Sequence, residues 1–335
     1  MEEVIQITKD IKAGNIKPVY FFMGEETYYI DKLVEFIECN VLAEHERDFN
    51  QSIMYGRDTT IEDIISTAKR FPMMAEKQVV IVKEAQELVR TIDKLENYLE
   101  NPQITTVLVF AYKYKTLDKR KKITKLLAKV GVVFESKKLY ENQVGIWITK
   151  ILKSQGYGID PKAALMLVEF LGTDLSKISN ELDKLKIVLQ KGHTITPKDI
   201  EDNIGISKDY NIFELRKAIG EKNELKAYQI AIYFSQNPKD NPTVVTTNSI
   251  FSFFIQLLQY HGTQDKNPIN IAKVLNTNPY FVKDYERAAR NFPMKKVSAI
   301  VATLRDIDLK SKGVGANALP QLDLLKEMLI HIFKS

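Results

Sequence analysis

The sequence has little of what a secreted or membrane-spanning protein needs. Among its 335 residues there is one cysteine, Cys39, so an intramolecular disulfide is impossible and a reducing compartment is expected. The most apolar stretch, residues 244–258, is interrupted by threonine, asparagine, serine and glutamine, whereas a membrane span needs about 20 mostly apolar residues. The chain begins Met-Glu-Glu, which is not the pattern of a signal peptide. We therefore expect a cytoplasmic protein with no membrane contact.

Residues that could catalyse a reaction or bind a metal are also sparse. The four histidines lack the spacing of metal ligands: His45, His193, His261 and His331. Cys39 lies at the end of a predicted helix without a histidine partner, which argues against a nucleophilic role. Residues 313–318 match G-x-G-x-x-A but follow a helical pattern rather than a strand, so we expect a loop between helices there. We expect no catalytic site, no metal and no cofactor.

The order of strand and helix patterns predicts the fold class. Within residues 1–140, short apolar runs alternate with helical patterns and indicate strands at 19–23, 79–82, 105–111 and 131–135. One of the helices between them is expected to begin at a capping box made by Thr59 and Glu62. Alternation of this kind predicts a parallel sheet covered by helices.

After Tyr140 we find no further strand pattern. Helical patterns fill a segment of about seventy residues, in which Thr196 and Pro197 have the sequence of a helix start. Further helical patterns run from Tyr210 to the end, with polar breaks at 236–242 and 262–268. The predicted fold class is therefore α/β followed by all-α.

The segment around Gly24 has the frame of a phosphate-binding loop without its chemistry. A buried strand, a glycine turn and a helix follow one another, but no Gly-Lys-Ser or Gly-Lys-Thr occurs anywhere in the chain. Glu25 and Glu26 stand at the helix start, where they would repel a triphosphate and where the helix dipole favours their charge. The strand at 79–82 ends in Lys83 and Glu84 rather than in the two acids that would hold Mg²⁺. We do not expect ATP hydrolysis.

A basic segment over residues 113–129 has two interpretations. It contains Asp118 as its single acid and eight basic residues: Lys113, Lys115, Lys119, Arg120, Lys121, Lys122, Lys125 and Lys129. We interpret it as a helix with an apolar face and a basic stripe. The stripe either faces the phosphates of DNA, with Lys119, Arg120, Lys121, Lys125 and Lys129 nearest to them, or is a solvated surface.

The short connection at residues 70–78 is the most informative candidate interaction site. Proline 72 disfavours the α conformation at Phe71, so the preceding helix must end before it. Met73 and Met74 then follow in a connection too short for both side chains to point into one core. At least one should project outward, where a flexible, polarisable side chain suits an adaptable interface. The alternative is a turn whose methionines cover the edge of the sheet.

Taken together, motifs spread over nearly the whole chain resemble the delta subunit family of the bacterial DNA polymerase III clamp loader. No one motif decides the match, which depends on their order and spacing. They are VYFFMGEE at 19–26, KEA at 83–85, VLVF at 107–110, KTLDKR at 115–120, GTDL at 172–175, NELDKL at 180–185 and YNIFEL at 210–215. The resemblance implies a divergent AAA+ fold in three parts, namely an α/β domain at 1–140, a three-helix lid at 141–209 and a helical collar for oligomerisation at 210–335.

The resemblance also implies a function. A delta subunit binds and opens the beta sliding clamp for loading onto primed DNA, while ATPase subunits and delta-prime complete the loader within the polymerase III holoenzyme. The chain lacks a Ser-Arg-Cys triplet, so it should not supply an arginine finger. The family's clamp contact falls here on Met73 and Met74, with Phe71 beside them, where other members tend to have Leu or Phe. Two rival interpretations remain, an active AAA+ ATPase and a stand-alone DNA-binding protein that uses the basic segment.

Overall fold

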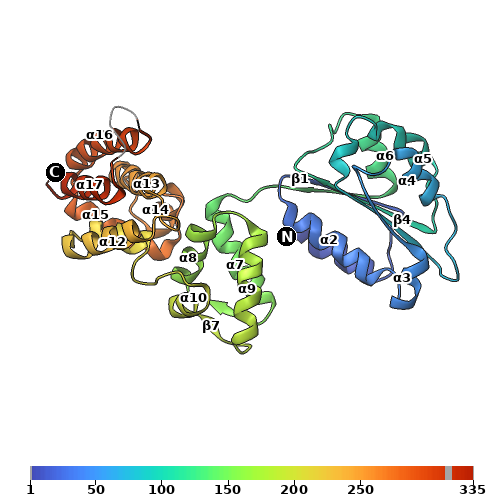
Figure 1. Cartoon of the computed structure of the whole chain (residues 1–335), viewed down its shortest axis with the longest axis horizontal. Helices are drawn as coiled ribbons and strands as arrows, with labels where there is room; N and C mark the ends of the chain where they lie inside the picture. The colour runs from blue at the N-terminus through green and yellow to red at the C-terminus, as the bar shows by residue number, and fades with distance from the viewer. Residues whose placement is uncertain (1, 314–318, 335) are drawn as a thin grey trace. The chain divides into compact units, whose positions relative to one another are not determined.

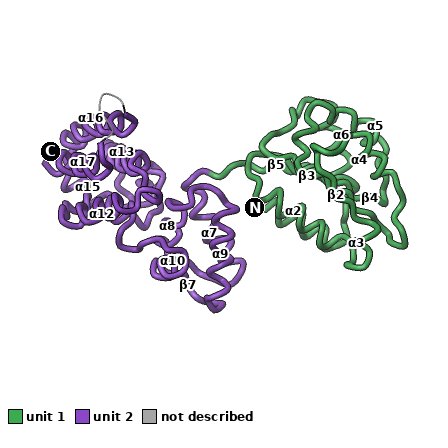
Figure 2. Tube along the Cα trace, in the orientation of Figure 1, with its two compact units in different colours: residues 1–139 green, residues 140–335 purple. Residues whose placement is uncertain are grey.

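The strands expected near the N-terminus assemble into one parallel sheet. The computed structural model describes residues 2–313 and 319–334, and the chain divides into unit 1, residues 1–139, and unit 2, residues 140–335 (Figure 2). In unit 1 the strand order is β2-β3-β4-β1-β5, and every neighbouring pair is parallel. The strands are β1 Val19–Gly24, β2 Gln51–Tyr55, β3 Gln78–Lys83, β4 Thr106–Lys113 and β5 Val132–Ser136.

Four of these strands confirm the sequence predictions, and β2 was missed. The missed strand lies at the edge of the sheet and is half-exposed, with the sequence Gln-Ser-Ile-Met-Tyr. An edge strand with polar residues and a mixed burial pattern lacks the continuous apolar run of a strand buried on both faces.

Helices cover both faces of the sheet. Figure 1 shows α2 on one face and α4, α5 and α6 on the other. Alternate residues of β1 pack against the helices on opposite faces of the sheet, because successive side chains of a strand point in opposite directions. Phe21 packs with the helices on the second face, while Ile30 and Leu33 of α2 are fully buried. The helical segments are α1 Glu2–Lys12, α2 Thr27–Asn40, α3 Glu44–Asn50, α4 Ile61–Ala68, η1 Ala85–Leu88, η2 Ile92–Leu95, α5 Glu96–Glu100 and α6 Lys122–Val130.

The predicted start of α4 is wrong by one residue. Thr60, not Thr59, is the N-cap, and its hydroxyl accepts the N–H of Asp63 at 3.2 Å. The Asp63 carboxylate in turn accepts the N–H of Thr60 at 3.3 Å. Thr59 with Glu62 and Thr60 with Asp63 both have the three-residue spacing of a capping box. The sequence pattern alone therefore allows the helix to start at either threonine.

The first part of unit 2 is a small helical group. All of residues 141–209 are described, and they form four helices where the resemblance implied three: α7 Glu141–Ser154, α8 Pro161–Leu171, α9 Leu175–Val188 and α10 Pro197–Ile204. Thr196 caps α10 and Pro197 is its first residue, as predicted. Two short strands, β6 Gly158–Ile159 and β7 Thr194–Ile195, pair in parallel, so the expectation of no strand after Tyr140 is wrong to that extent.

The second part of unit 2 is entirely helical in its described residues. One core of buried side chains joins all of its α-helices, and the predicted breaks at 236–242 and 262–268 are confirmed. Its elements are α11 Ile212–Gly220, α12 Glu224–Gln236, α13 Thr243–Gly262, α14 Pro268–Val274, η3 Pro279–Phe281, α15 Val282–Asn291, α16 Met294–Ser311 and α17 Gln321–Lys334. Residues 314–318 of the G-x-G-x-x-A segment lie outside the described residues.

The predicted fold class, α/β followed by all-α, is confirmed. The division of unit 2 into a lid at 141–209 and a collar at 210–335 stays a prediction. Of the helices described, none is long and apolar enough to cross a membrane.

Candidate functional site

The turn from β1 to α2 lies at the carboxyl edge of the sheet, where a nucleotide-binding protein would hold phosphate. Gly24 ends β1 with φ of 130°, and a Cβ atom there would collide with the backbone oxygen of Ser136 in β5. The glycine is therefore required by the close approach of two strands. Its presence needs no bound phosphate to explain it.

A carboxylate of the chain itself occupies the start of α2. Glu26 is the N-cap, is 7% exposed, and accepts the N–H of Tyr28 on Oε1 at 3.0 Å. Free N–H groups at a helix start are what would otherwise bind an anion such as phosphate. Glu25, beside it, is exposed. A carboxylate of the chain thus caps the helix at the position where a phosphate-binding loop would meet its ligand.

Lysines at the ends of two neighbouring strands pair with carboxylates of α2. Lys83, the last residue of β3, places Nζ 3.4 Å from Glu38, and Lys113, the last residue of β4, places Nζ 2.6 Å from Asp31. Glu84 follows β3 in a left-handed conformation with φ of 54° and lies 3.6 Å from Arg57. Within residues 2–313 and 319–334, no three His, Cys, Asp or Glu side chains form a group that could hold a metal ion.

The loop between α4 and β3 lies at the opposite, amino edge of the same sheet. Phe71 is 76% exposed, Met73 62% and Met74 103%. Both methionines project outward, which confirms the expectation that at least one would. The alternative, in which they cover the edge of the sheet as buried side chains, is wrong. Their partner is a separate question.

Buried amide side chains hold the backbone of this loop. Asn50, the last residue of α3, is 4% exposed; its Oδ1 accepts the N–H of Met73 at 2.6 Å and its Nδ2 donates to the Met73 carbonyl at 2.9 Å. Gln78 donates to the carbonyl of Arg70 and, at 2.8 Å, to the hydroxyl of Thr106. The exposed side chains are therefore carried on a backbone anchored at several points.

Sequence reasoning missed Asn50 and Gln78. Asn50 acts on a residue 23 positions away, and Gln78 meets Thr106 only because β3 and β4 pair in that register. A polar residue just before or at the start of a strand has many ordinary explanations. No local pattern could have identified these contacts.

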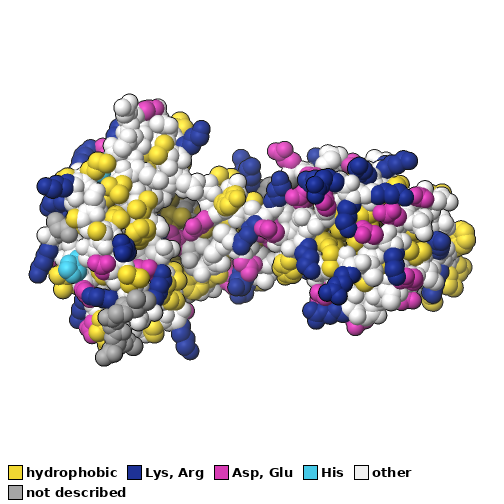
Figure 3. Space-filling model, turned by 90° about the horizontal axis from the view of Figure 1, so that it is seen from above, with side chains coloured by type: hydrophobic (Ala, Val, Ile, Leu, Met, Phe, Trp, Pro, Cys, Tyr) yellow, Lys and Arg dark blue, Asp and Glu magenta, His cyan; other side chains and the backbone are white. Residues whose placement is uncertain are grey.

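Two more exposed apolar residues lie at the amino ends of the strands that flank β3. Phe49 precedes β2 and is 73% exposed, and Ile104 precedes β4 and is 75% exposed. Lys77 donates to the Ile104 carbonyl at 2.8 Å. In Figure 3, apolar side chains gather at one end of unit 1. We name the following set the amino-edge surface: Phe49, Phe71, Met73, Met74 and Ile104.

The basic segment is not one helix. Lys113 still belongs to β4, and helix α6 begins only at Lys122. Tyr114 turns the chain with φ of 63°, and the buried Leu117 packs into the core between the two elements. The prediction of a helix over 113–129 is wrong for its first half, because strand pairing continues to the level of Gly24 in β1.

Most of the cations in this segment have carboxylate partners. Hydrogen bonding from Lys119, 2.7 Å away, lowers the pKa of Glu135, and hydrogen bonding from Arg120 lowers that of Asp118. Arg120 lies 2.7 Å from Asp118. The other ion pairs are Lys121–Asp93 at 3.0 Å, Lys122–Glu100 at 3.0 Å and Lys122–Glu96 at 3.4 Å. In the described part of the chain, no carboxylate lies within 4.0 Å of the ammonium groups of Lys115, Lys125 and Lys129. Whether the basic stripe contacts DNA stays a prediction.

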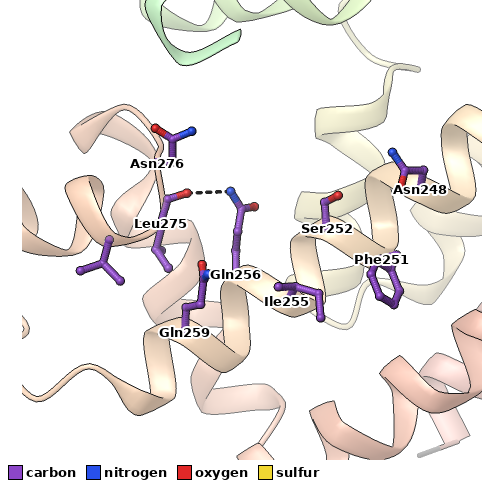
Figure 4. Close-up of a pocket in the computed structure, with 9 residues that line it drawn as sticks. Asn248, Phe251, Ser252, Ile255, Gln256, Gln259, Leu275 and Asn276 are labelled. Atoms are coloured by element: carbon purple, nitrogen blue, oxygen red, sulfur yellow. Dashed lines mark hydrogen bonds between the residues drawn. The ribbon is translucent and has the colours of Figure 1, made fainter. Parts of the chain in front are cut away.

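A pocket of about 350 Å³ lies along α13 and α14 in unit 2. Figure 4 shows the amide of Gln256 donating to the carbonyl of Leu275, a hydrogen bond of 2.8 Å. The other polar side chains that line the pocket and are labelled in Figure 4 belong to Asn248, Ser252, Gln259 and Asn276. None of the lining residues is ionisable, so the pocket lacks a side-chain general acid or general base.

The parallel sheet, with the frame of a phosphate-binding loop at Gly24, and the helical part that follows place the chain in the class of α/β proteins with a helical C-terminal part. The sequence model described as "DNA polymerase III, delta subunit" matches residues 20–137, and that of the "DNA polymerase III delta subunit, C-terminal domain" matches residues 209–326. The chain belongs to the delta subunit family of DNA polymerase III. The delta subunit is a component of the clamp loader.

Two known proteins are similar over nearly the whole chain. DNA polymerase III subunit delta of Bacillus subtilis (strain 168) is 28% identical over 319 residues, which are 92% of each chain. The solved structure of the Bacillus subtilis DNA clamp loader delta protein (YqeN) matches with a TM-score of 0.55 at 27% identity, over 99% of this chain and 100% of that one.

Proposed function

We propose that this chain binds the beta sliding clamp through Phe71, Met73 and Met74, and that binding opens the ring for loading onto primed DNA. The observation that carries the proposal is the exposure of both methionines, 62% and 103%, on a loop anchored by buried amides. Apolar anchors on an ordered surface are typical of protein interfaces. The solved Bacillus subtilis relative is a DNA clamp loader delta protein, which supports a sliding clamp as the partner.

The chemistry of the two side chains fits a wedge mechanism. Methionine is unbranched and polarisable, so Met73 and Met74 can adapt to an apolar pocket on the clamp. Binding shifts the clamp toward an open interface only if these contacts are stronger in the open ring than in the closed one. The delta chain supplies that difference in affinity, and no covalent step is needed.

We further propose that this chain does not hydrolyse ATP and has no catalytic site of its own. Three features support this: the missing Gly-Lys-Ser/Thr sequence, the Glu26 carboxylate at the start of α2, and Lys83 at the end of β3 in place of an acid. ATP hydrolysis is then left to the ATPase subunits. The rival interpretation as an active AAA+ ATPase requires a triphosphate to displace Glu26.

The remaining proposals concern assembly. We assign contacts with the ATPase and delta-prime subunits to the collar at 210–335, whose helices expose apolar residues such as Leu225, Val245 and Ile269. DNA is reached through the complex, in the cytoplasm. The rival interpretation, stand-alone DNA binding, would rely on the basic segment at 113–129, and it predicts a strongly salt-dependent affinity for DNA without any partner.

The test is the double variant Met73→Ala/Met74→Ala, measured for clamp affinity and for urea unfolding. Truncating two anchors costs about 2 kcal/mol or more, so affinity should fall about thirtyfold or further. Stability should change by about 0.5 kcal/mol or less, because exposed residues contribute little to the core. A fluorophore pair across one clamp interface should report opening with the parent chain and not with the variant.

Met294→Ala is the matched control. This methionine is 52% exposed on α16 in unit 2, so its loss should alter neither clamp affinity nor opening. Unchanged affinity in the double variant would overturn the loop assignment. A parent chain that does not bind the clamp at all would overturn the proposed function.

A further inference from the structure

One buried side chain holds both backbone polar groups of Met73. Asn50 accepts the N–H of Met73 at 2.6 Å, donates to the Met73 carbonyl at 2.9 Å, and donates to the Glu46 carbonyl within its own helix at 3.1 Å. These contacts fix the peptide planes on both sides of Met73. They use the amide oxygen as acceptor and the amide nitrogen as donor at the same residue.

The helix that carries Asn50 is itself anchored. Arg47 donates to the carbonyl of Cys39 at 2.7 Å, which ties α3 to the last turn of α2. Glu46 accepts the N–H of Ala43 at 2.9 Å, which secures the start of α3. Asn50 is therefore a fixed point from which the loop is held.

The residue after Met73 has an unfavourable backbone conformation. Met74 has φ of 52°, a left-handed conformation that a side chain with a Cβ atom rarely adopts. Such conformations persist where the surrounding structure imposes them, and they are concentrated at functional sites. Here the two bonds from Asn50 hold the backbone directly before Met74, and the Met74 side chain is fully exposed.

We propose that Asn50 is a positioning residue for the clamp contact: it holds the loop in its presenting conformation before the clamp arrives. This rests on the proposed function of Met73 and Met74. An interface loop that is already ordered loses less conformational freedom on binding, so its contacts yield a higher affinity. Asn50 itself is buried, so it would act through the backbone of Met73 and not by direct contact with the clamp.

The experiment compares Asn50→Ala with a matched control, Asn211→Ala, in the full chain. Asn211 is also buried and also bonds backbone on both sides, accepting from Phe213 N at 3.0 Å and donating to Ser207 O at 2.9 Å, but it lies in unit 2. Asn50→Ala should lower clamp affinity about tenfold, the order expected for ordering a loop on binding. Asn211→Ala should leave the affinity of the folded chain unchanged.

Hydrogen exchange shows whether Asn50→Ala loosens this loop without loosening the sheet. Exchange at the Met73 amide should rise strongly in Asn50→Ala, while the amides of β3 stay protected. The thermodynamic cycle with Met73→Ala/Met74→Ala is the second readout. If Asn50 acts only by presenting the methionines, adding Asn50→Ala to the Met73→Ala/Met74→Ala chain should cause no further loss of clamp affinity.

Three outcomes would overturn the proposal in distinguishable ways. If the double methionine variant weakens binding but Asn50→Ala does not, the positioning role fails and the clamp-contact assignment stands. If neither variant changes the affinity, both fail. Equal losses for Asn50→Ala in the parent and in the methionine-free background would also reject positioning, because Asn50 would then act elsewhere.

Discussion

The two edges of the parallel sheet in unit 1 have opposite characters. At the carboxyl edge Lys83 and Lys113 pair with carboxylates of α2, and Glu26 caps that helix. At the amino edge Met73 and Met74 are exposed, on a loop anchored by buried amides. Open α/β sheets usually bind their ligands at the carboxyl edge. Here that edge is closed by the chain's own groups, and the exposed apolar surface lies at the other edge.

If the carboxyl edge binds no nucleotide, as we propose, the fold has been kept without a ligand site there. Gly24 and the α2 start are retained because the sheet needs the close approach to Ser136 and the helix needs a cap. These needs are structural, so they persist without a nucleotide. The amino-edge loop has no such role in packing, and its exposed side chains are free to serve a partner.

The largest expected effect belongs to the carboxyl edge and is structural. Gly24→Ala places a methyl group against the Ser136 backbone, so we expect a loss of about 3 kcal/mol or more in the free energy of unfolding. Gly14→Ala is the control, since Gly14 has φ of 81° but no atom within 4 Å of its Cβ position, and it should lose about 1 kcal/mol. Equal losses in urea unfolding would show that the strand approach is not what requires Gly24.

The next effect separates stability from binding. Glu26→Ala removes the cap of α2, so stability should fall by about 1 kcal/mol while clamp affinity stays unchanged. Glu25→Ala, at an exposed neighbour, should change stability by about 0.5 kcal/mol or less. Met73→Ala/Met74→Ala is expected to do the reverse, lowering clamp affinity and leaving stability almost unchanged. A loss of clamp affinity in Glu26→Ala would remove the contrast between the two edges.

A smaller effect concerns pH. The hydrogen bond from Lys119 holds the pKa of the Glu135 carboxyl below its ordinary 4.5. Because the folded-state pKa is the lower one, the contribution to stability is complete above the unfolded value and is lost as the pH falls through the folded pKa. In Lys119→Met the Glu135 pKa should rise toward 4.5 in a carboxyl NMR titration. An unchanged titration would show that Lys119 does not pair with Glu135 in solution.

The last prediction is that ATP has no effect on the stability of the chain. Millimolar ATP with Mg²⁺ should leave the melting temperature of the parent chain unchanged, because Glu26 occupies the start of α2 and Lys83 replaces a metal-binding acid. A ligand present at 100 times its dissociation constant would add about 2.7 kcal/mol and several degrees. A shift of that size would show that the carboxyl edge is open to nucleotide, and would favour the ATPase interpretation.

The sequence by itself determined the main elements. Continuous apolar runs placed four of the five strands, and Thr196-Pro197 placed the start of α10, because buried strands and helix caps have local signatures. It also located the exposed connection, since Pro72 must end α4 and two adjacent methionines cannot both turn inward. The missing Gly-Lys-Ser/Thr was likewise readable without a structure.

Only the tertiary structure decided how these elements are used. The edge strand β2 has no continuous apolar run, and the basic segment was misread as one helix because strand pairing with β1 extends β4 to Lys113. The ion pairs that neutralise most of that segment join residues as far apart as Lys113 and Asp31. Asn50 holds Met73 across 23 residues. Contacts between distant residues depend on strand order and register, which no local pattern encodes.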